Sequence, residues 1–189
     1  KGHKLPQEHK TTVKKVIFSK SFSLLCLIEL IVFCSLLTIV VQIVPHAMDL
    51  GLQQVTATSV LSTIGGMSML GRLGMGAAYD RLGGKLTLMI CFSVLISGFV
   101  ILQAAQSFWT LFLFACIYGF AHGGFFTIMS PTVAEFFGTQ FHGTLFSIVL
   151  FCGTIGGSAG PLLAGYTFDV TQTYQLFFLG LTLLLCIGL

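Results

Sequence analysis

Residues 71–85 read GRLGMGAAYDRLGGK and hold four charged side chains, in a chain where only 8% of the 189 residues are charged. The four are Arg72, Asp80, Arg81 and Lys85. Hydrophobic residues make up 55% of the sequence, whereas a soluble domain carries about 25% charged residues. Because only helices satisfy their own backbone across lipid at this segment length, the sequence predicts an all-α integral membrane protein.

Six apolar runs predict six transmembrane helices. A bilayer core needs about 20 apolar residues to be crossed by a helix. The predicted spans cover residues 22–44, 52–78, 86–104, 108–129, 144–165 and 174–189. The last run is shorter than a full span and the sequence does not begin with Met, so we expect a fragment.

The positions of Lys and Arg predict the orientation. Residues 1–20 hold six of the nine basic residues, and Arg81 and Lys85 lie between the second and third spans. The connections expected on the opposite side hold no Lys or Arg, namely residues 45–51, 105–107 and 166–173. The positive-inside rule therefore places residues 1–20 in the cytoplasm, as a basic loop segment before the six-helix unit of residues 21–189. This accounts for the basic residues without a nucleic-acid partner, in a plasma membrane or bacterial inner membrane.

The remaining reactive side chains indicate no catalytic chemistry. All six cysteines lie in apolar runs without CxxC spacing, which is typical of small buried hydrophobic residues rather than of a metal site. The sequence shows no catalytic pair and no phosphate-binding loop. We therefore expect neither an enzyme nor a metal or cofactor.

An internal repeat links the charged stretch to a second segment. Shifting the chain by 89 positions aligns GRLGMGAAYD, residues 71–80, with GPLLAGYTFD, residues 160–169. The residues that match are Gly71, Leu73, Gly76 and Asp80 in the first segment and Gly160, Leu162, Gly165 and Asp169 in the second. Since the first copy ends inside and the second outside, the alignment predicts three helices repeated with inverted orientation.

The charged loop resembles the signature loop of the major facilitator superfamily. Residues 76–85 match its pattern G-x-x-x-D-R-x-G-R-R/K at Gly76, Asp80, Arg81, Gly83 and Lys85, with Gly84 in place of an arginine. The resemblance implies a 3+3 inverted repeat that forms helices seven to twelve of a twelve-helix transporter. It also implies a partner, the N-terminal six-helix half, against which this half rocks.

The loop residues also have roles that follow from their chemistry. Gly83 and Gly84 permit a tight reversal between two helices. Arg81 and Lys85 favour the anionic inner leaflet. Asp80 is expected either to pair with Arg81 or to cap a neighbouring helix as part of a gate; the alternative is a plain turn that only sets topology.

Three ionisable residues lie inside predicted spans, at one expected depth on three helices: Glu29, Arg72 and His122. Arg72 lies about 12 Å inside its helix end at 1.5 Å per residue. An arginine there costs at least ~2.5 kcal/mol, so it must face a cavity or a partner. It either captures a substrate carboxylate, or it serves a structural ion pair or snorkels toward the membrane interface.

His122 and Glu29 each have two interpretations. His122, with Tyr118 one turn away, either binds substrate and passes a proton or is satisfied by hydrogen bonds between helices. Glu29 either neutralises Arg72 when the site is empty or carries the proton, or else it caps polar groups near its helix start. Both remain proton-coupling candidates from the sequence.

The fifth span carries glycines at four-residue spacing, Gly153 with Gly157 and Gly156 with Gly160. This spacing favours close helix packing, and a smooth sliding contact is the alternative. The fourth span is expected to end at Pro131. In the loop that follows, Glu135 and His142 are expected to be solvated.

Within the superfamily, the chain is similar to the group of monocarboxylate transporters and oxalate–formate antiporters. Three stretches carry this similarity: VPHAMDLGLQQVTA (44–57), the Gly71-Arg72 pair, and SPTVAEFFGTQFHGTLFS (130–147) together with GPLLAGYTFDVTQTY (160–174). The resemblance implies that Arg72 binds a substrate carboxylate. The expected function is proton-coupled symport of a small monocarboxylate by alternating access. An organic-anion exchanger and a transport-inactive membrane sensor with the same fold are the alternatives.

Overall fold

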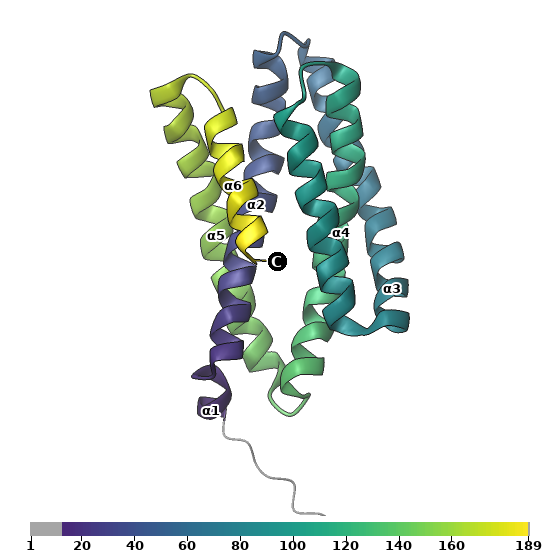
Figure 1. Cartoon of the computed structure of the whole chain (residues 1–189), viewed down its shortest axis with the longest axis vertical. Helices are drawn as coiled ribbons and strands as arrows, with labels where there is room; N and C mark the ends of the chain where they lie inside the picture. The colour runs from purple at the N-terminus through teal and green to yellow at the C-terminus, as the bar shows by residue number, and fades with distance from the viewer. Residues whose placement is uncertain (1–12, 189) are drawn as a thin grey trace, which may run out of the picture.

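The computed structural model describes residues 13–188, and every regular element in that range is a helix (Figure 1). The helices are α1 Val13–Ile17, α2 Lys20–Asp49, α3 Gln54–Gln103, α4 Phe108–Phe137, α5 His142–Thr171 and α6 Gln175–Gly188. Helices α2 to α5 are long and apolar enough to cross a membrane, and α6 is a shorter apolar helix. The prediction of an all-helical integral membrane protein is confirmed for this part of the chain.

Helix α3 reverses direction at Gly83, whose backbone has a φ of 77°. The first arm of α3, residues 54–82, runs parallel to α4, because Ile64 meets Gly119 and Ser68 meets Gly123. The second arm, residues 84–103, runs the other way, since Phe99 packs on Tyr118 and Phe92 on Phe125. A left-handed φ of this size favours glycine. The predicted turn between the second and third spans therefore lies at Gly83.

Helices α2, α4 and α5 extend beyond the predicted spans. Helix α4 continues through Pro131 to Phe137, so the expected end at Pro131 is wrong. Hydropathy detects only the apolar stretch of the sequence. Helix α4 continues past that stretch into the more polar boundary of the membrane, so its end was placed too early. Ser107 caps the start of α4 by accepting a hydrogen bond from the Thr110 amide at 3.4 Å.

The connections alternate between two ends of the bundle (Figure 1). Helix α1, the turn at Gly83 and the α4–α5 connection lie at one end. The α2–α3, α3–α4 and α5–α6 connections lie at the other. This grouping is the one that the positive-inside rule requires, and the orientation itself stays a prediction.

Glycines bring two pairs of helices into backbone contact. A Cβ atom added at Gly156 would overlap the Leu30 carbonyl, which fixes α5 against α2. A Cβ atom at Gly123 would overlap the Ser68 carbonyl, which fixes α4 against the first arm of α3. The four glycines singled out in the fifth span all lie against α2: Gly153, Gly156, Gly157 and Gly160.

Substitution of Gly123 by alanine tests the close contact of α4 with α3. The new methyl meets backbone that moves only if the helices separate, and such overpacking costs about 1–3 kcal/mol. We expect a lower unfolding temperature for the purified protein in detergent. Gly66→Ala is the matched control, because nothing lies within 4 Å of its Cβ position. Equal unfolding temperatures for the two variants would contradict the contact.

Candidate functional site

The structure brings Arg72 and His122 together across the contact of α3 and α4. Ser68, one turn before Arg72, is buried, and its hydroxyl lies 3.3 Å from Nδ1 of His122. Arg72 thus follows, by one helical turn, the residue whose hydroxyl meets His122. Arg72 itself is exposed and lies 11 residues before the turn at Gly83, about 16 Å along the helix. An arginine thus reaches an open face of the bundle at membrane depth.

Small and polar residues lead along the same arm toward Arg72. The exposed positions between its start and Arg72 include Thr58, Ser59, Ser62, Gly65 and Gly66. Their hydroxyls bond back to the helix, as Ser62 does to the Thr58 carbonyl at 3.1 Å. Beside Arg72 itself the exposed neighbours are apolar, namely Met69, Leu70 and Leu73, so the hydroxyl residues belong to the part of the arm nearer its start. An arginine inside a membrane span faces a partner or a water-filled cavity.

Tyr118 lies on the closed side of α4. Its side chain is fully buried, and its hydroxyl donates a 2.6 Å hydrogen bond to the Leu36 carbonyl of α2. Because this hydroxyl is already committed to a helix contact, the position supports a packing role. Tyr118 is therefore not among the residues that we propose to bind substrate.

Glu29 lies apart from the Arg72 site. It is 1% exposed and sits between α2 and α5, where its Cγ would be 3.0 Å from a Cβ atom at Gly153. Its Oε2 atom is buried without a hydrogen-bond partner in the described chain. Among residues 13–188 it forms no ion pair with Arg72. The three ionisable residues expected at one depth therefore divide into a pair and a separate carboxyl.

Glu135 is exposed, but it lies on α4 and not in a loop, and it braces the signature loop. Its Oε2 accepts hydrogen bonds from the Tyr79 hydroxyl at 2.6 Å and from the Gly84 amide at 2.8 Å. A side chain at position 84 would meet this carboxylate at 2.7 Å, which explains why glycine fits there. The sequence alone did not reveal this contact, because Glu135 is far from both partners along the chain: 51 positions from Gly84 and 56 from Tyr79. In addition, α4 was expected to end before Glu135.

The other loop residues project outward. Asp80, Arg81 and Lys85 are exposed, and Asp80 forms no ion pair with Arg81 within the residues that the structure describes. His142 is engaged as well, since its Nε2 lies 3.2 Å from the Ser130 hydroxyl, so its expected solvation is wrong.

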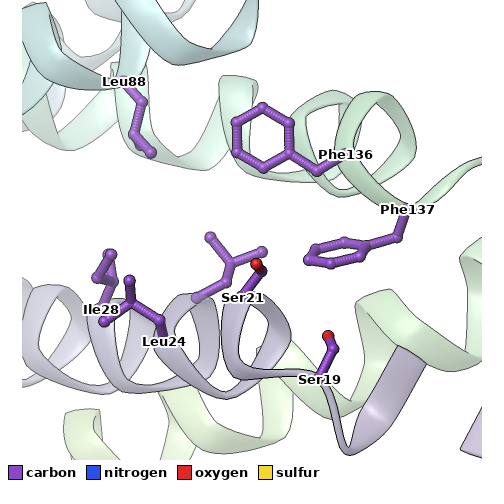
Figure 2. Close-up of a pocket in the computed structure, with 8 residues that line it drawn as sticks. Ser19, Ser21, Leu24, Ile28, Leu88, Phe136 and Phe137 are labelled. Carbon is purple, nitrogen blue, oxygen red and sulfur yellow. The ribbon is translucent and has the colours of Figure 1, made fainter. Parts of the chain in front are cut away.

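A cavity of about 450 Å³ opens between α2, the second arm of α3 and the end of α4. Figure 2 shows its apolar walls, with the hydroxyls of Ser19 and Ser21 on one side. The lining residues are Ser19, Ser21, Leu24, Leu25, Ile28, Leu88, Phe136 and Phe137. No charged side chain lines it, so it does not suit an anion. In the described residues, no three His, Cys, Asp or Glu side chains gather in a way that would hold a metal ion.

The geometry agrees with a comparison against known families. The family model of the Major Facilitator Superfamily matches residues 24–189. The chain belongs to the Major Facilitator Superfamily. The match begins within α2 and covers the other membrane-length helices in full, including Arg72 on α3 and His122 on α4.

Several monocarboxylate transporters are similar to this superfamily member. Monocarboxylate transporter 12 of Rattus norvegicus is 29% identical over 143 residues, which cover 74% of this chain and 29% of the relative. Monocarboxylate transporter 13 of Rattus norvegicus is 28% identical and covers 71% of this chain and 32% of the relative. Monocarboxylate transporter 4 of Gallus gallus is 26% identical and covers 93% of this chain and 39% of the relative. The resemblance to the monocarboxylate group is confirmed, and the chain spans well under half the length of these relatives.

Substitution of Glu135 by alanine tests its role in the loop. Removing an acceptor of two hydrogen bonds to a charged group costs about 1–3 kcal/mol. We expect a lower unfolding temperature in detergent, with a smaller loss for Tyr79→Phe, which keeps the bond to Gly84. Asp169→Ala is the control, because that carboxyl is exposed. If Glu135→Ala unfolds at the temperature of the control, the carboxylate does not brace the loop.

Proposed function

We propose that the chain is the C-terminal six-helix half of a twelve-helix transporter, built as a 3+3 inverted repeat. The contacts between helices support the repeat. Leu30 of α2 meets Gly156 of α5. Under the 89-residue shift between the repeats, Leu30 corresponds to Gly119 and Gly156 corresponds to Met67. Gly119 and Met67 are also in contact. Sequence alignment alone does not use this information, so the agreement is independent support.

Side-chain hydrogen bonds follow the same shift. The Thr38 hydroxyl donates to the Cys34 carbonyl at 2.6 Å, and the Thr127 hydroxyl donates to the Gly123 carbonyl at 3.2 Å. Both pairs are related by 89 positions. We infer that the first repeat consists of α2 and the two arms of α3. The second repeat consists of α4, α5 and α6.

We propose that this half takes part in secondary active transport of a small monocarboxylate. The observation that carries the proposal is the exposed guanidinium of Arg72 at membrane depth, next to His122. A guanidinium offers paired donors that match a carboxylate, and an arginine in a membrane span faces a partner or a water-filled cavity. A single cation suits a monoanion. The names of the relatives agree with this substrate class.

In this mechanism the row of small polar residues on α3 lines one wall of a cavity, and the N-terminal half forms the other wall. The substrate carboxylate binds Arg72 from that cavity. Rocking of the two halves then exposes the site to the opposite side of the membrane. The exposed Asp80, Arg81 and Lys85 lie where the cytoplasmic ends of the halves meet and separate.

We further propose that a proton accompanies the anion and that the protein resides in the plasma membrane or bacterial inner membrane, with residues 1–20 in the cytoplasm. Proton symport would make the transported species neutral overall. Glu29 and His122 are the candidates for the proton, because each lies inside a membrane span.

Substitution of Arg72 tests the proposed function. We expect the full-length protein in proteoliposomes to take up one of lactate, pyruvate, formate or oxalate, faster with an inward proton gradient. Arg72→Ala and Arg72→Lys should each reduce uptake by at least about 100-fold, since a lost charge-assisted bidentate bond is worth about 3 kcal/mol. Lys14→Ala, on the exposed α1, is the control and should transport normally.

Transport that survives Arg72→Ala would make this arginine structural. Uptake that needs an anion on the opposite side, and not a proton gradient, would identify an exchanger. Failure of all four acids with a folded protein would favour a sensor.

A further inference from the structure

Glu29 is a buried carboxyl with a site of its own. It is 1% exposed, and Oε2 has no hydrogen-bond partner in the described chain. The titratable groups around it are two thiols, Cys26 on the preceding turn of α2 and Cys152 on α5, which lie within hydrogen-bonding reach of each other. No charged group in residues 13–188 acts on Glu29.

The contact with α5 leaves room for the carboxyl and for little else. A Cβ atom at Gly153 would stand 3.0 Å from Cγ of Glu29 and 3.2 Å from the ring of Phe33. An ionised carboxylate without a partner is very costly in such surroundings, whereas a neutral carboxylic acid is tolerated. The closed contact of α2 with α5 is therefore compatible with the protonated form. Release of the proton requires water or a partner to reach the group, which means that the contact must change.

His122 is less suited to hold the proton. Its Nδ1 atom already has the Ser68 hydroxyl as a partner at 3.3 Å. It also lies near Arg72, because its partner Ser68 precedes that arginine by one turn of the same helix. Adding a proton to His122 would place a second positive charge next to the first, which is electrostatically unfavourable.

Packed rings join the Glu29 site to the Arg72 site. Phe33 follows Glu29 by one turn of α2, and its ring centroid lies 5.2 Å from that of Phe126 on α4. The ring of Phe126 in turn lies 5.0 Å from that of His122. A change in the contact of α2 with α5 thus has a continuous route of packed side chains to the substrate site, through Phe33, Phe126 and His122.

We propose that Glu29 carries the coupled proton, in a buried site between α2 and α5 that is separate from the carboxylate site at Arg72. This rests on the proposed function of proton-linked monocarboxylate transport. In this arrangement substrate and proton do not compete for one site. Proton and substrate are coupled through the contact of α2 with α5, because binding of either one shifts the arrangement of that contact.

The test uses Glu29→Gln in the full-length protein, reconstituted in proteoliposomes, with the acid that the wild type transports. Glutamine mimics the protonated carboxyl and cannot release a proton. We expect exchange of labelled for unlabelled acid at equal pH to persist in this variant. We expect accumulation to be lost: a gradient of one pH unit drives about tenfold accumulation in a one-to-one symporter, and the variant should reach no more than equilibration. In the wild type, uptake of the anion together with a proton raises the pH of the outer medium, and this pH rise should also disappear in the variant.

Asp169→Asn makes the same carboxyl-to-amide change at an exposed position outside the site; it is the matched control and should keep gradient-driven accumulation. If Glu29→Gln accumulates substrate and His122→Gln does not, the proton resides on His122 and the proposal is overturned. If Glu29→Gln loses exchange as well, while still binding the acid through Arg72, Glu29 is structural and the proposal is likewise overturned. Glu29→Asp, which keeps the carboxyl, should restore accumulation. A wild type that transports none of the acids would instead contradict the proposed function and not the role of Glu29 within it.

Discussion

The arrangement depends on backbone contact between helices at glycine. At Gly123 and at Gly156 the facing helix comes so close that a single added methyl would overlap a carbonyl oxygen. In a membrane, helices gain little from burying apolar surface, so such close packing supplies much of their attraction. The contact at Gly123 also sets the site, because Ser68, whose carbonyl lies there, carries the hydroxyl that meets His122.

Two ionisable groups inside the membrane spans, Arg72 and Glu29, lie in opposite environments, one exposed and the other buried. Arg72 is exposed on an open face of the bundle, where water or an anion can reach it. Glu29 is enclosed between α2 and α5 and lacks a charged neighbour in the described chain. An exposed cation and an enclosed acid are suited to different ligands, a carboxylate and a proton. The aromatic contacts of Phe33, Phe126 and His122 connect the two.

Much of the fold could be predicted from the sequence, because long apolar runs in a bilayer have helices as their solution. The reversal at Gly83 was also predictable, since adjacent glycines interrupt a charged stretch between two such runs. The end of α4 was not, because the helix continues past the apolar stretch that hydropathy detects. The role of Glu135 followed from that extension and from contacts with Tyr79 and Gly84, which are distant in sequence.

The candidate site was predictable in its residue types and less so in its grouping. Counting turns placed Glu29, Arg72 and His122 at one depth, but depth does not say which way a side chain points. The rotation of each helix about its axis is set by the glycine contacts, and these join Arg72 with His122 and direct Glu29 toward α5. For the same reason Tyr118 turned out to bond to Leu36 of α2.

The most direct test of the account is the binding of a monocarboxylate and of its neutral amide to the purified full-length protein, measured by calorimetry at constant pH. If the exposed guanidinium of Arg72 recognises the carboxylate, the acid should bind and the amide of the same size should not, and Arg72→Gln should abolish the difference. Equal binding of acid and amide, or a preference for the acid that persists in Arg72→Gln, would contradict the assignment of Arg72 as the substrate-binding group.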